Sequence, residues 1–167
     1  MIRATLAALC LLLSAPAWGQ DPTVDVATDD PAMVRAYDGA AATLPAFLDR
    51  SGALTGTAGP LFSVKIAVPV DDTGMDDEVI WVSNVRIRRN GKAEGTLDNE
   101  PVAMPGKHAG DRIKFHLDDI RDWSLIGADQ KLYGHYTTRV LLDHMDGAQA
   151  DALRRILSEN PVPADWQ

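Results

Sequence analysis

Two acids and an amide stand together in LDNEP, residues 97–101, and these residue types bind polar ligands or carry out acid–base chemistry. Asp98, Asn99 and Glu100 lie between a predicted strand and a loop rich in Pro and Gly. A local interpretation stays open, because Asn99 can hydrogen-bond its own backbone in a turn. Pro101 also favours an extended residue before it, so the segment can be a polar turn.

A second acidic segment, LDDIRDW at residues 117–123, supplies Asp119 and Asp122. Two carboxylates serve as acid and base when their surroundings drive their pKa values apart. We therefore expect any site in this chain to form where this segment meets LDNEP, with Trp81 and Trp123 as its walls. The structural alternative is that Asp119 or Asp122 caps a helical turn or pairs with an arginine.

Arg139 stands in YTTRVLL, next to apolar residues that look buried. A partly buried arginine needs a partner, because an unpaired buried charge is costly. We expect Asp119 or Asp122 to be that partner, which makes Arg139 a structural residue as well as a candidate site residue.

Other reactive side chains match no known motif. The chain has no H-E-x-x-H, no P-loop, no dinucleotide fingerprint and no G-x-S-x-G elbow around its strand serines, Ser63, Ser83 and Ser124. The histidines are His108, His116, His135 and His144. His108 and His116 could share a metal with Asp118, but a zinc site needs further ligands. We predict no catalytic set, no metal site and no cofactor.

Two charged loops have a binding interpretation and a plainer one. The acidic run at residues 71–78 offers oxygen ligands for a cation such as calcium, but it lacks the EF-hand alternation and fits a solvated hairpin tip. A basic tip is formed by Arg86, Arg88, Arg89 and Lys92. Arginine grips carboxylate or phosphate with two parallel hydrogen bonds, so this tip could hold an anionic partner or pair with neighbouring acids such as Glu94.

Helical periodicity marks both ends of the domain. Asp29, Asp30 and Pro31 predict a helix start, and apolar residues at spacings of three and four continue it to residue 47. Pro45 predicts a kink or a restart. Residues 51–60 read as a linker. From residue 137 a helical pattern returns, and Asp146-Gly147 divides it in two.

Between these helices the period changes to two, which predicts strands at 62–68, 79–89, 92–97 and 112–116. Asn90-Gly91 predicts a tight hairpin. Residues 117–123 read as a short helical turn, and a further hairpin is expected across 127–130. Tight turns make the strands antiparallel, so we predict an α+β fold: a bent antiparallel sheet of about four to six strands with N- and C-terminal helices packed on it.

The first 19 residues read as a secretory signal peptide: Arg3, an apolar run of about ten residues, and small residues before the expected cut at Gln20. Ala15-Pro16-Ala17 is a second possible site. A membrane helix needs about 20 apolar residues, so a permanent anchor is disfavoured. Leu9 before Cys10 disfavours a lipid anchor as well. We expect a periplasmic or secreted protein with a cysteine-free mature chain and no membrane insertion after cleavage.

Charge and length bound the rest. Sixteen Lys and Arg oppose 24 Asp and Glu, a net charge of −8, which becomes −9 when Arg3 leaves with the signal peptide. An acidic surface argues against nucleic-acid partners. We expect a flexible lead at 20–30, a single domain at 31–158 and a loose tail at 159–167.

Several pieces of the chain, in order, are similar to the YegJ-like proteins, known as domain of unknown function family 2314: WVSNV, LDNEP, GDRIKF, DDIRDW and YTTRVL. The resemblance covers roughly residues 31 to 158. It implies a compact α+β domain that is often exported. The family has no assigned activity, substrate or cofactor, so the resemblance implies no catalytic residues here.

The leading hypothesis is an exported domain that binds an unknown protein, peptide or envelope component and catalyses nothing. Its binding residues would be Trp81, Asp98, Asn99, Glu100, Asp119, Asp122, Trp123 and Arg139. The competing hypothesis is an envelope hydrolase that uses the carboxylates of LDNEP and LDDIRD. A purely structural, stress-related or toxin-neutralising envelope protein is the third.

Overall fold

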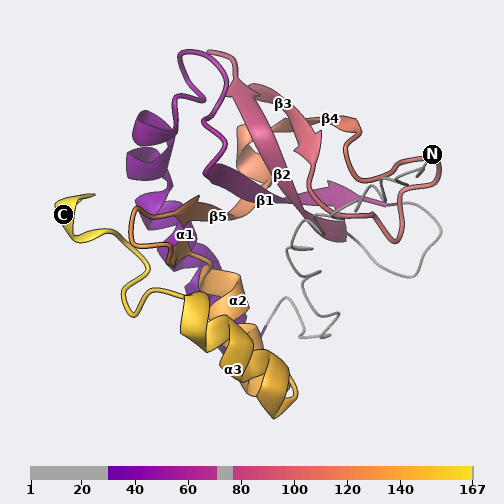
Figure 1. Cartoon of the computed structure of the whole chain (residues 1–167). Coiled ribbons are helices and arrows are strands. Elements are labelled where there is room, and N and C mark those ends of the chain that lie inside the picture. The colour runs from indigo at the N-terminus through magenta and orange to yellow at the C-terminus, as the bar shows by residue number, and fades with distance from the viewer. Residues whose placement is uncertain (1–29, 71–76, 167) are drawn as a thin grey trace, which may run out of the picture.

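A computed structural model describes residues 30–70 and 77–166, in which three α-helices flank one antiparallel sheet (Figure 1). The expected signal peptide, most of the flexible lead and most of the acidic loop at 71–78 lie outside these residues. None of the helices in the described ranges is long and apolar enough to cross a membrane. The element order, helix then strands then helices, confirms the predicted α+β class.

Six strands form the sheet in the order β4-β3-β2-β1-β5-β6, and each neighbouring pair is antiparallel. The strands are β1 (Phe62–Pro69), β2 (Asp77–Ile87), β3 (Lys92–Leu97), β4 (Arg112–His116), β5 (Ile120–Ile126) and β6 (Leu132–Gly134). The sheet therefore holds the strands predicted from alternation, and β5 and β6 form the further hairpin expected across 127–130.

Helix α1 (Pro31–Ser51) opens the domain. The Asp30 carboxylate caps it by accepting hydrogen bonds from the backbone N–H groups of Ala32 (2.7 Å) and Met33 (3.3 Å). Gly52 ends it in the left-handed conformation, at φ 82°. Pro45 was expected to kink or restart the helix. The helix does not restart there, because α1 is a single element of 21 residues that contains Pro45.

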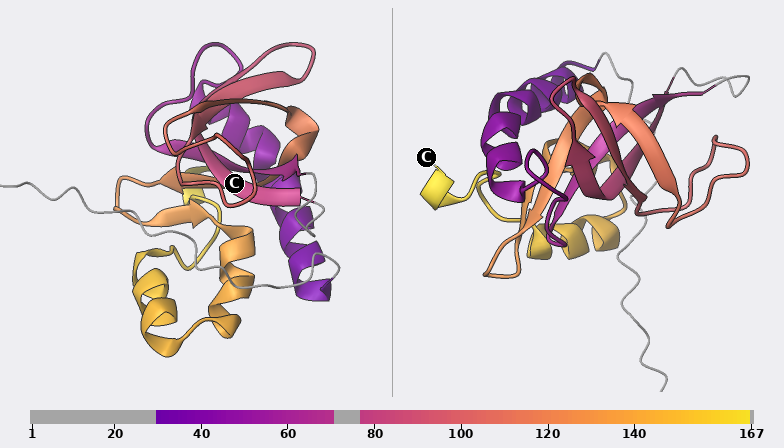
Figure 2. Two further views of the ribbon diagram at one scale, coloured as in Figure 1. Left: turned by 90° about the vertical axis from the view of Figure 1, so that its right-hand side faces the viewer. Right: turned by 90° about the horizontal axis from the view of Figure 1, so that it is seen from above.

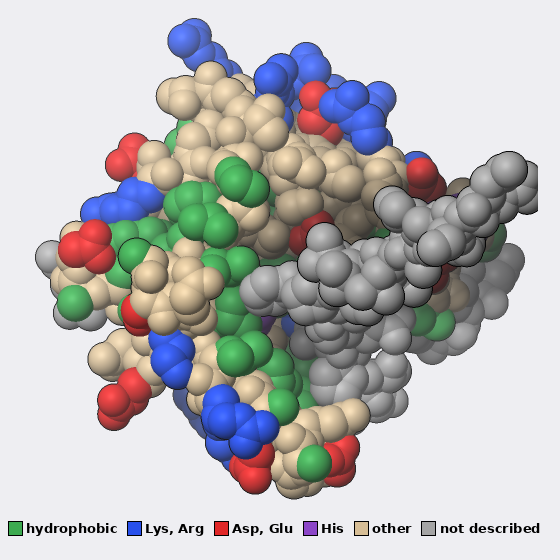
Figure 3. All heavy atoms as spheres, in the orientation of Figure 1, with side chains coloured by type: hydrophobic (Ala, Val, Ile, Leu, Met, Phe, Trp, Pro, Cys, Tyr) green, Lys and Arg blue, Asp and Glu red, His purple; other side chains and the backbone are tan. Residues whose placement is uncertain are grey.

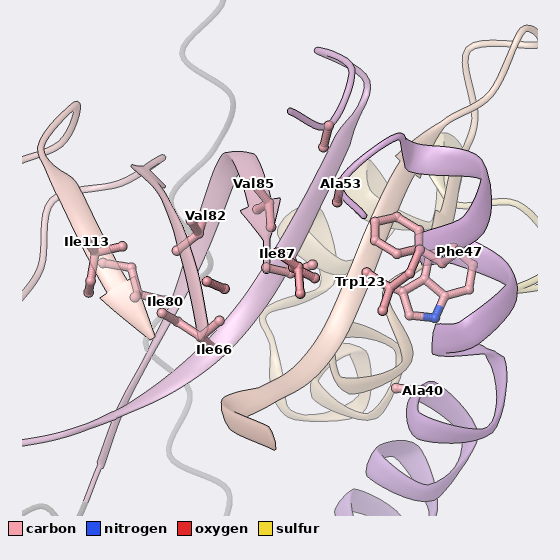
Figure 4. Packing of buried hydrophobic residues seen from close by; sticks show 14 of the residues in the cluster. Ala40, Phe47, Ala53, Ile66, Ile80, Val82, Val85, Ile87, Ile113 and Trp123 are labelled. Carbon is pink, nitrogen blue, oxygen red and sulfur yellow. The ribbon is translucent and has the colours of Figure 1, made fainter. Parts of the chain in front are cut away.

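The core lies between α1 and one face of the sheet (Figure 4). Ile66 on β1 and Val82 on β2 are fully buried there, and the Phe47 ring of α1 stacks on Trp123 of β5 with 5.0 Å between ring centroids. Burial of large apolar side chains is the main driving force for such packing. Helix α1 packs chiefly on β5 and on the helix that follows the sheet, and the core continues from there along β1 and β2.

The β2–β3 hairpin follows the prediction from Asn90-Gly91. Gly91 adopts φ 78°, the Asn90 side chain accepts from the Lys92 N–H at 3.2 Å, and β3 begins at Lys92. Strand β4 also has the predicted bounds. Lys and Arg side chains gather along the top of the molecule in Figure 3.

Residues 117–123 were predicted as a helical turn, and this prediction is wrong for most of the segment. Only Leu117–Asp119 forms a 3-10 turn, closed by the Asp119 carboxylate on the His116 N–H at 2.6 Å. Ile120 onward belongs to β5, which pairs with β1 in the middle of the sheet. Pairing with β1 overrides the local turn signal of the three acids.

The C-terminal part turns back over the opposite face. Gly134 at φ 74° ends β6, and any side chain there would overlap the Trp123 carbonyl. Helices α2 (Tyr136–Leu141) and α3 (Gly147–Ile156) follow, with Asp146 capping α3 as the predicted break. In the right-hand view of Figure 2, α3 lies on the other side of the strands from α1.

The last residues were expected to be loose, yet they contact the core. Trp166 stacks on Trp123 at 5.6 Å, and the Arg50 guanidinium lies 4.9 Å from the Trp166 ring centroid. The two prolines of the tail suggested a loose segment, and no pattern in the sequence indicated this packing.

Candidate functional site

A groove of about 790 Å³ opens between the polar face of the sheet and α3. Its apolar wall comes from α3, from β5 and β6 and from the segment before β1, and its polar floor comes from β1, β2 and β5. In Figure 3 hydrophobic side chains gather between the sheet and α3, where the surface is hollowed. The lining residues are Pro60, Leu61, Ser63, Trp81, Ser83, Asp98, Asn99, Ser124, Ile126, Leu132, His135, Thr138, Gln149, Ala152, Leu153 and Ile156.

The hollow arises from small residues on neighbouring strands. Ser63 pairs with Ser124 in the β1–β5 register, and Ser83 follows Trp81 by two positions on β2, so the three serines share one face. At these positions the three neighbouring strands carry only hydroxymethyl groups, which leaves space above this part of the sheet. The serines were noted in the sequence, but only their strand pairing shows that they form one floor.

LDNEP closes one end of the groove. The Asp98 N–H donates to the Trp81 carbonyl at 3.0 Å, which holds the segment against β2. The Asp98 carboxylate accepts from the Ser63 hydroxyl at 3.0 Å, and Asn99 lies beside it in the lining. The structure thus brings together three of the predicted site residues: Trp81, Asp98 and Asn99.

His135 joins the groove to its buried surroundings, and sequence reasoning missed it. Its backbone is left-handed at φ 52°, a conformation that costs free energy in residues other than Gly and Asn. Its Nε2 lies 2.8 Å from the Ser124 Oγ, and its Nδ1 lies 3.2 Å from the Thr138 Oγ1. The centroid of its ring lies 4.8 Å from that of Trp81. No spacing pattern in the sequence marks this position.

Beneath Trp81 lies a buried charge network. Asp122 is fully buried, and its oxygens accept from the backbone N–H groups of Trp123 (2.8 Å), Tyr136 (3.1 Å) and Thr137 (2.8 Å). The Thr137 hydroxyl donates to Asp122 at 2.7 Å and accepts from the Lys65 ammonium at 3.3 Å. The Lys65 ammonium also lies 4.8 Å from the Trp81 ring centroid.

Two opposing effects act on the Asp122 carboxyl. Burial raises its pKa, because desolvation disfavours the charged form, while the charge of Lys65 and the hydrogen bonds from Thr137 and Trp123 lower it. The net direction is upward. Asp122 also holds the first turn of α2 through Tyr136 and Thr137, which gives it a structural role behind the groove.

Arg139 was expected to pair with Asp119 or Asp122, and within the described residues it forms no ion pair with either. Its Nε donates to the Gly134 carbonyl at 3.1 Å, and one of its terminal nitrogens is buried with no hydrogen-bond partner. Burial lowers the pKa of Arg139, and the charge of Asp122 partly offsets this. Asp122 does not need Arg139, because it already accepts four hydrogen bonds from Trp123, Tyr136 and Thr137.

The remaining predicted residues lie apart from the groove lining. The Glu100 carboxylate turns toward its own loop, where it meets the His108 Nδ1 at 2.6 Å and the Ala109 N–H at 3.0 Å. Asp119 closes the turn after β4, and Trp123 is buried on the apolar face. The acids of LDNEP and LDDIRD therefore do not converge on one pocket.

The contact between Ser124 and His135 invites comparison with a nucleophile and its base. The Ser124 hydroxyl belongs to the middle of a paired strand, and the residue is only 9% exposed. The Nδ1 of His135 meets the Thr138 hydroxyl, which does not stabilise an imidazolium as the carboxylate of a catalytic triad does. This geometry positions hydrogen-bonding groups on a groove floor.

The charged clusters noted in the sequence lie elsewhere. His116 contacts Asp118 at 3.1 Å as a local pair, and no group of three potential metal ligands occurs in the part of the chain that the structure describes. In the basic tip, Arg86 donates to the Thr57 hydroxyl at 3.3 Å. Glu94 is paired by Arg112 of β4, at 3.3 Å.

Comparison with known proteins gives one match. The model of a family described as "Uncharacterized protein conserved in bacteria (DUF2314)" matches residues 30–155, three quarters of the chain and nearly all of the fold described above. No curated protein and no solved structure matches the chain.

Proposed function

The chain belongs to the DUF2314 family of bacterial proteins, and we propose that it is a non-catalytic binding module that holds a small amphipathic ligand in the groove beside α3. One observation carries this proposal: the groove has a volume of about 790 Å³, with a hydroxyl-lined floor on one side and an apolar helix wall on the other. Pockets for small ligands are typically of this size and combine apolar walls with a few placed polar groups.

Exposed apolar side chains at the groove support the proposal. Leu61 is 48% exposed and Ile156 is 40% exposed, and both belong to the groove lining. Covering apolar surface that is exposed to water stabilises the complex by roughly 25 cal/mol per Å². A ligand with an apolar portion would cover these two side chains while its polar end meets the serine floor.

The distribution of acids favours binding over hydrolysis. The competing function needs carboxylates of LDNEP and LDDIRD close together around a substrate. Asp98 contacts Ser63 in the groove, whereas Asp122 is fully buried beneath α2 and Asp119 closes a turn. A hydrolase would therefore have to work with a single groove carboxylate.

We propose further that the domain works in the periplasm or outside the cell, with a component of the envelope as its partner. The first 19 residues carry the pattern of a cleaved signal peptide, and the net charge of −8 disfavours nucleic acid. Mass spectrometry of protein from the periplasmic fraction should find a chain that begins near Gln20. An uncleaved chain confined to the cytoplasm would contradict this location.

The binding proposal is tested with N-phenyl-1-naphthylamine, a neutral apolar dye whose fluorescence rises when it leaves water. Purified mature protein should bind it in the groove, and Ala152→Trp should abolish binding because the indole fills the lining. Ala148→Trp is the matched control, since Ala148 is an exposed residue of α3 outside the lining. Equal binding by both variants would refute the groove as the site.

The hydrolase is tested in the same preparation. A panel of ester, amide and glycoside substrates should show no turnover by mature protein above the buffer rate. Turnover that Asp98→Asn removes, with folding intact by circular dichroism, would overturn the non-catalytic proposal in favour of the enzyme.

A further inference from the structure

We infer that the groove selects a cationic amphiphile, a molecule whose protonated amine meets Asp98 and whose hydrocarbon part lies along α3. The inference rests on the proposed function, because it names the class of ligand for the same groove. It is carried by the position of one carboxylate in a lining that otherwise holds hydroxyl, amide, imidazole and apolar groups.

The Asp98 carboxylate is held in place and has bonding capacity left. Its Oδ2 accepts from the Ser63 hydroxyl at 3.0 Å, and its backbone N–H is fixed to the Trp81 carbonyl at 3.0 Å. Its Oδ1 has no hydrogen bond within residues 30–70 and 77–166. An ionised carboxylate accepts several hydrogen bonds, so Asp98 can take a further donor without losing Ser63.

No Lys or Arg belongs to the described lining, and Asp98 is the one carboxylate among the described lining residues. A buried cation of the network behind the groove is Lys65, which is only 5% exposed. Its ammonium lies under the Trp81 ring and bonds to Thr137, and it offsets the charge of its register partner Asp122. Asp98 therefore offers a ligand a carboxylate that no Lys or Arg of the described lining accompanies.

The opposite wall sets the second requirement. Leu153 and Ile156 of α3 face the groove together with Leu61, and they offer only apolar contact. A ligand that placed its amine at Asp98 could extend its hydrocarbon part between these side chains. Charge-assisted hydrogen bonds are about twice as strong as neutral ones, so an amine gains more at Asp98 than an alcohol of equal length.

An anionic amphiphile meets the reverse situation. Its carboxylate would face Asp98 at short range, and like charges in close contact are unfavourable. The whole chain adds to this preference, because a net charge of −8 attracts cations and repels anions before contact. We expect the order of affinity to be amine, then alcohol, then carboxylate.

The test compares decylamine, 1-decanol and decanoate below their critical micelle concentrations, each displacing N-phenyl-1-naphthylamine from mature protein. Decylamine should bind about tenfold more tightly than 1-decanol, and decanoate should bind most weakly. Raising the salt concentration should weaken decylamine alone, because only its contact is an ion pair.

Asp98→Asn should reduce decylamine affinity about tenfold and leave 1-decanol unchanged, since the amide keeps the shape and removes the charge. Asp151→Asn is the matched control: it removes an exposed acid of α3 that is not part of the lining, and it should keep the preference.

The outcomes separate this inference from the function on which it rests. If decylamine and 1-decanol bind equally in both the wild type and Asp98→Asn, the groove binds amphiphiles and the charge preference is refuted. If the dye and all three ligands fail to bind, the binding function itself is refuted along with it.

Discussion

The two faces of the sheet differ although the same three strands build both. On the apolar face, β1, β2 and β5 present Ile66, Val82 and Trp123, all fully buried in one core. One residue away on each strand, the other face carries Lys65, Trp81 and Asp122 under α2. Alternation along each strand thus separates an all-apolar layer from a layer of charge, aromatic and hydroxyl groups.

The difference shows which face is free to serve binding. The apolar face is filled by large interlocking side chains, so any ligand there would have to displace the core. The polar face holds a left-handed His135, a buried ion network and a row of serines, which stabilise less and leave a groove. Stability and the candidate function are therefore assigned to opposite sides of one sheet.

The comparison is tested most strongly from the apolar side. Phe47→Ala should lower the free energy of unfolding by about 3–5 kcal/mol, because it removes a fully buried ring that stacks on Trp123. Urea denaturation followed by circular dichroism measures this loss. Ser83→Ala on the groove floor is the control and should change stability by at most about 0.5 kcal/mol. Similar losses for both variants would mean that the two faces share the stabilising role.

The polar face has one residue whose loss should be nearly as costly. Asp122→Ala should lower the free energy of unfolding by about 3 kcal/mol, because Lys65 loses the negative charge that it faces and three backbone donors lose their acceptor. Thermal and urea denaturation both report the change.

A double variant sharpens this result. Replacing the pair together, as Asp122→Leu with Lys65→Met, should recover part of the loss, since apolar side chains often replace a buried ion pair without cost. A double variant less stable than Asp122→Ala would show that the caps on Tyr136 and Thr137, rather than the charge balance, dominate.

Sequence reasoning succeeded where local chemistry decides the structure. Asn90-Gly91 fixed the hairpin, Asp146 fixed the start of α3, and alternation located β1 to β4 within a few residues. It failed at residues 120–123, whose acids and Trp read as a turn. There the register with β1 decides the conformation, and no local pattern contains that information.

The residues of the candidate site also divide into those that the sequence predicted and those that it could not. Asp98 and Asn99 were chosen as polar residues after a predicted strand and Trp81 as an aromatic wall, and the three do share the groove. Asp119 and Asp122 were chosen as carboxylates of a predicted helical turn, and they lie in a turn and in the buried network. The hairpin expected across 127–130 is present as β5–β6, but His135, Ser124 and the α3 wall meet the others through the pairing of β5 with β1 and through the helices after β6, which sequence spacing cannot supply.

Arg139 offers a smaller test of the polar face. Arg139→Ala should lower stability by about 1 kcal/mol and reduce the melting temperature, because the Nε loses its bond to the Gly134 carbonyl. Part of this loss is offset, since the change also removes a buried nitrogen that has no hydrogen-bond partner. Arg139→Met keeps much of the side-chain length without the charge, and its melting temperature should lie between those of the wild type and Arg139→Ala. An unchanged melting temperature for Arg139→Ala would show that the guanidinium contributes nothing net to the fold.

The smallest effect concerns the loop that carries LDNEP. Glu100 and His108 form an exposed pair, in which hydrogen bonds from the Ala109 N–H and His108 lower the pKa of Glu100, and the bond to Glu100 raises the pKa of His108. The Glu100 contribution is present above the ordinary glutamate pKa of 4.5 and is lost as pH falls through its lowered pKa. The His108 contribution is complete below the ordinary histidine pKa of 6.5 and is lost as pH rises through its raised pKa.

His108→Gln should therefore lower the melting temperature most between pH 4.5 and 6.5, and the difference from the wild type should shrink at alkaline pH and in high salt. Because both side chains are exposed, the whole effect should stay well below that of Arg139→Ala. His144→Gln is the matched control, since His144 is also exposed but lies after α2, far along the chain from this loop. A difference that grows with rising pH would mean that neutral His108 holds the loop through a hydrogen bond rather than an ion pair.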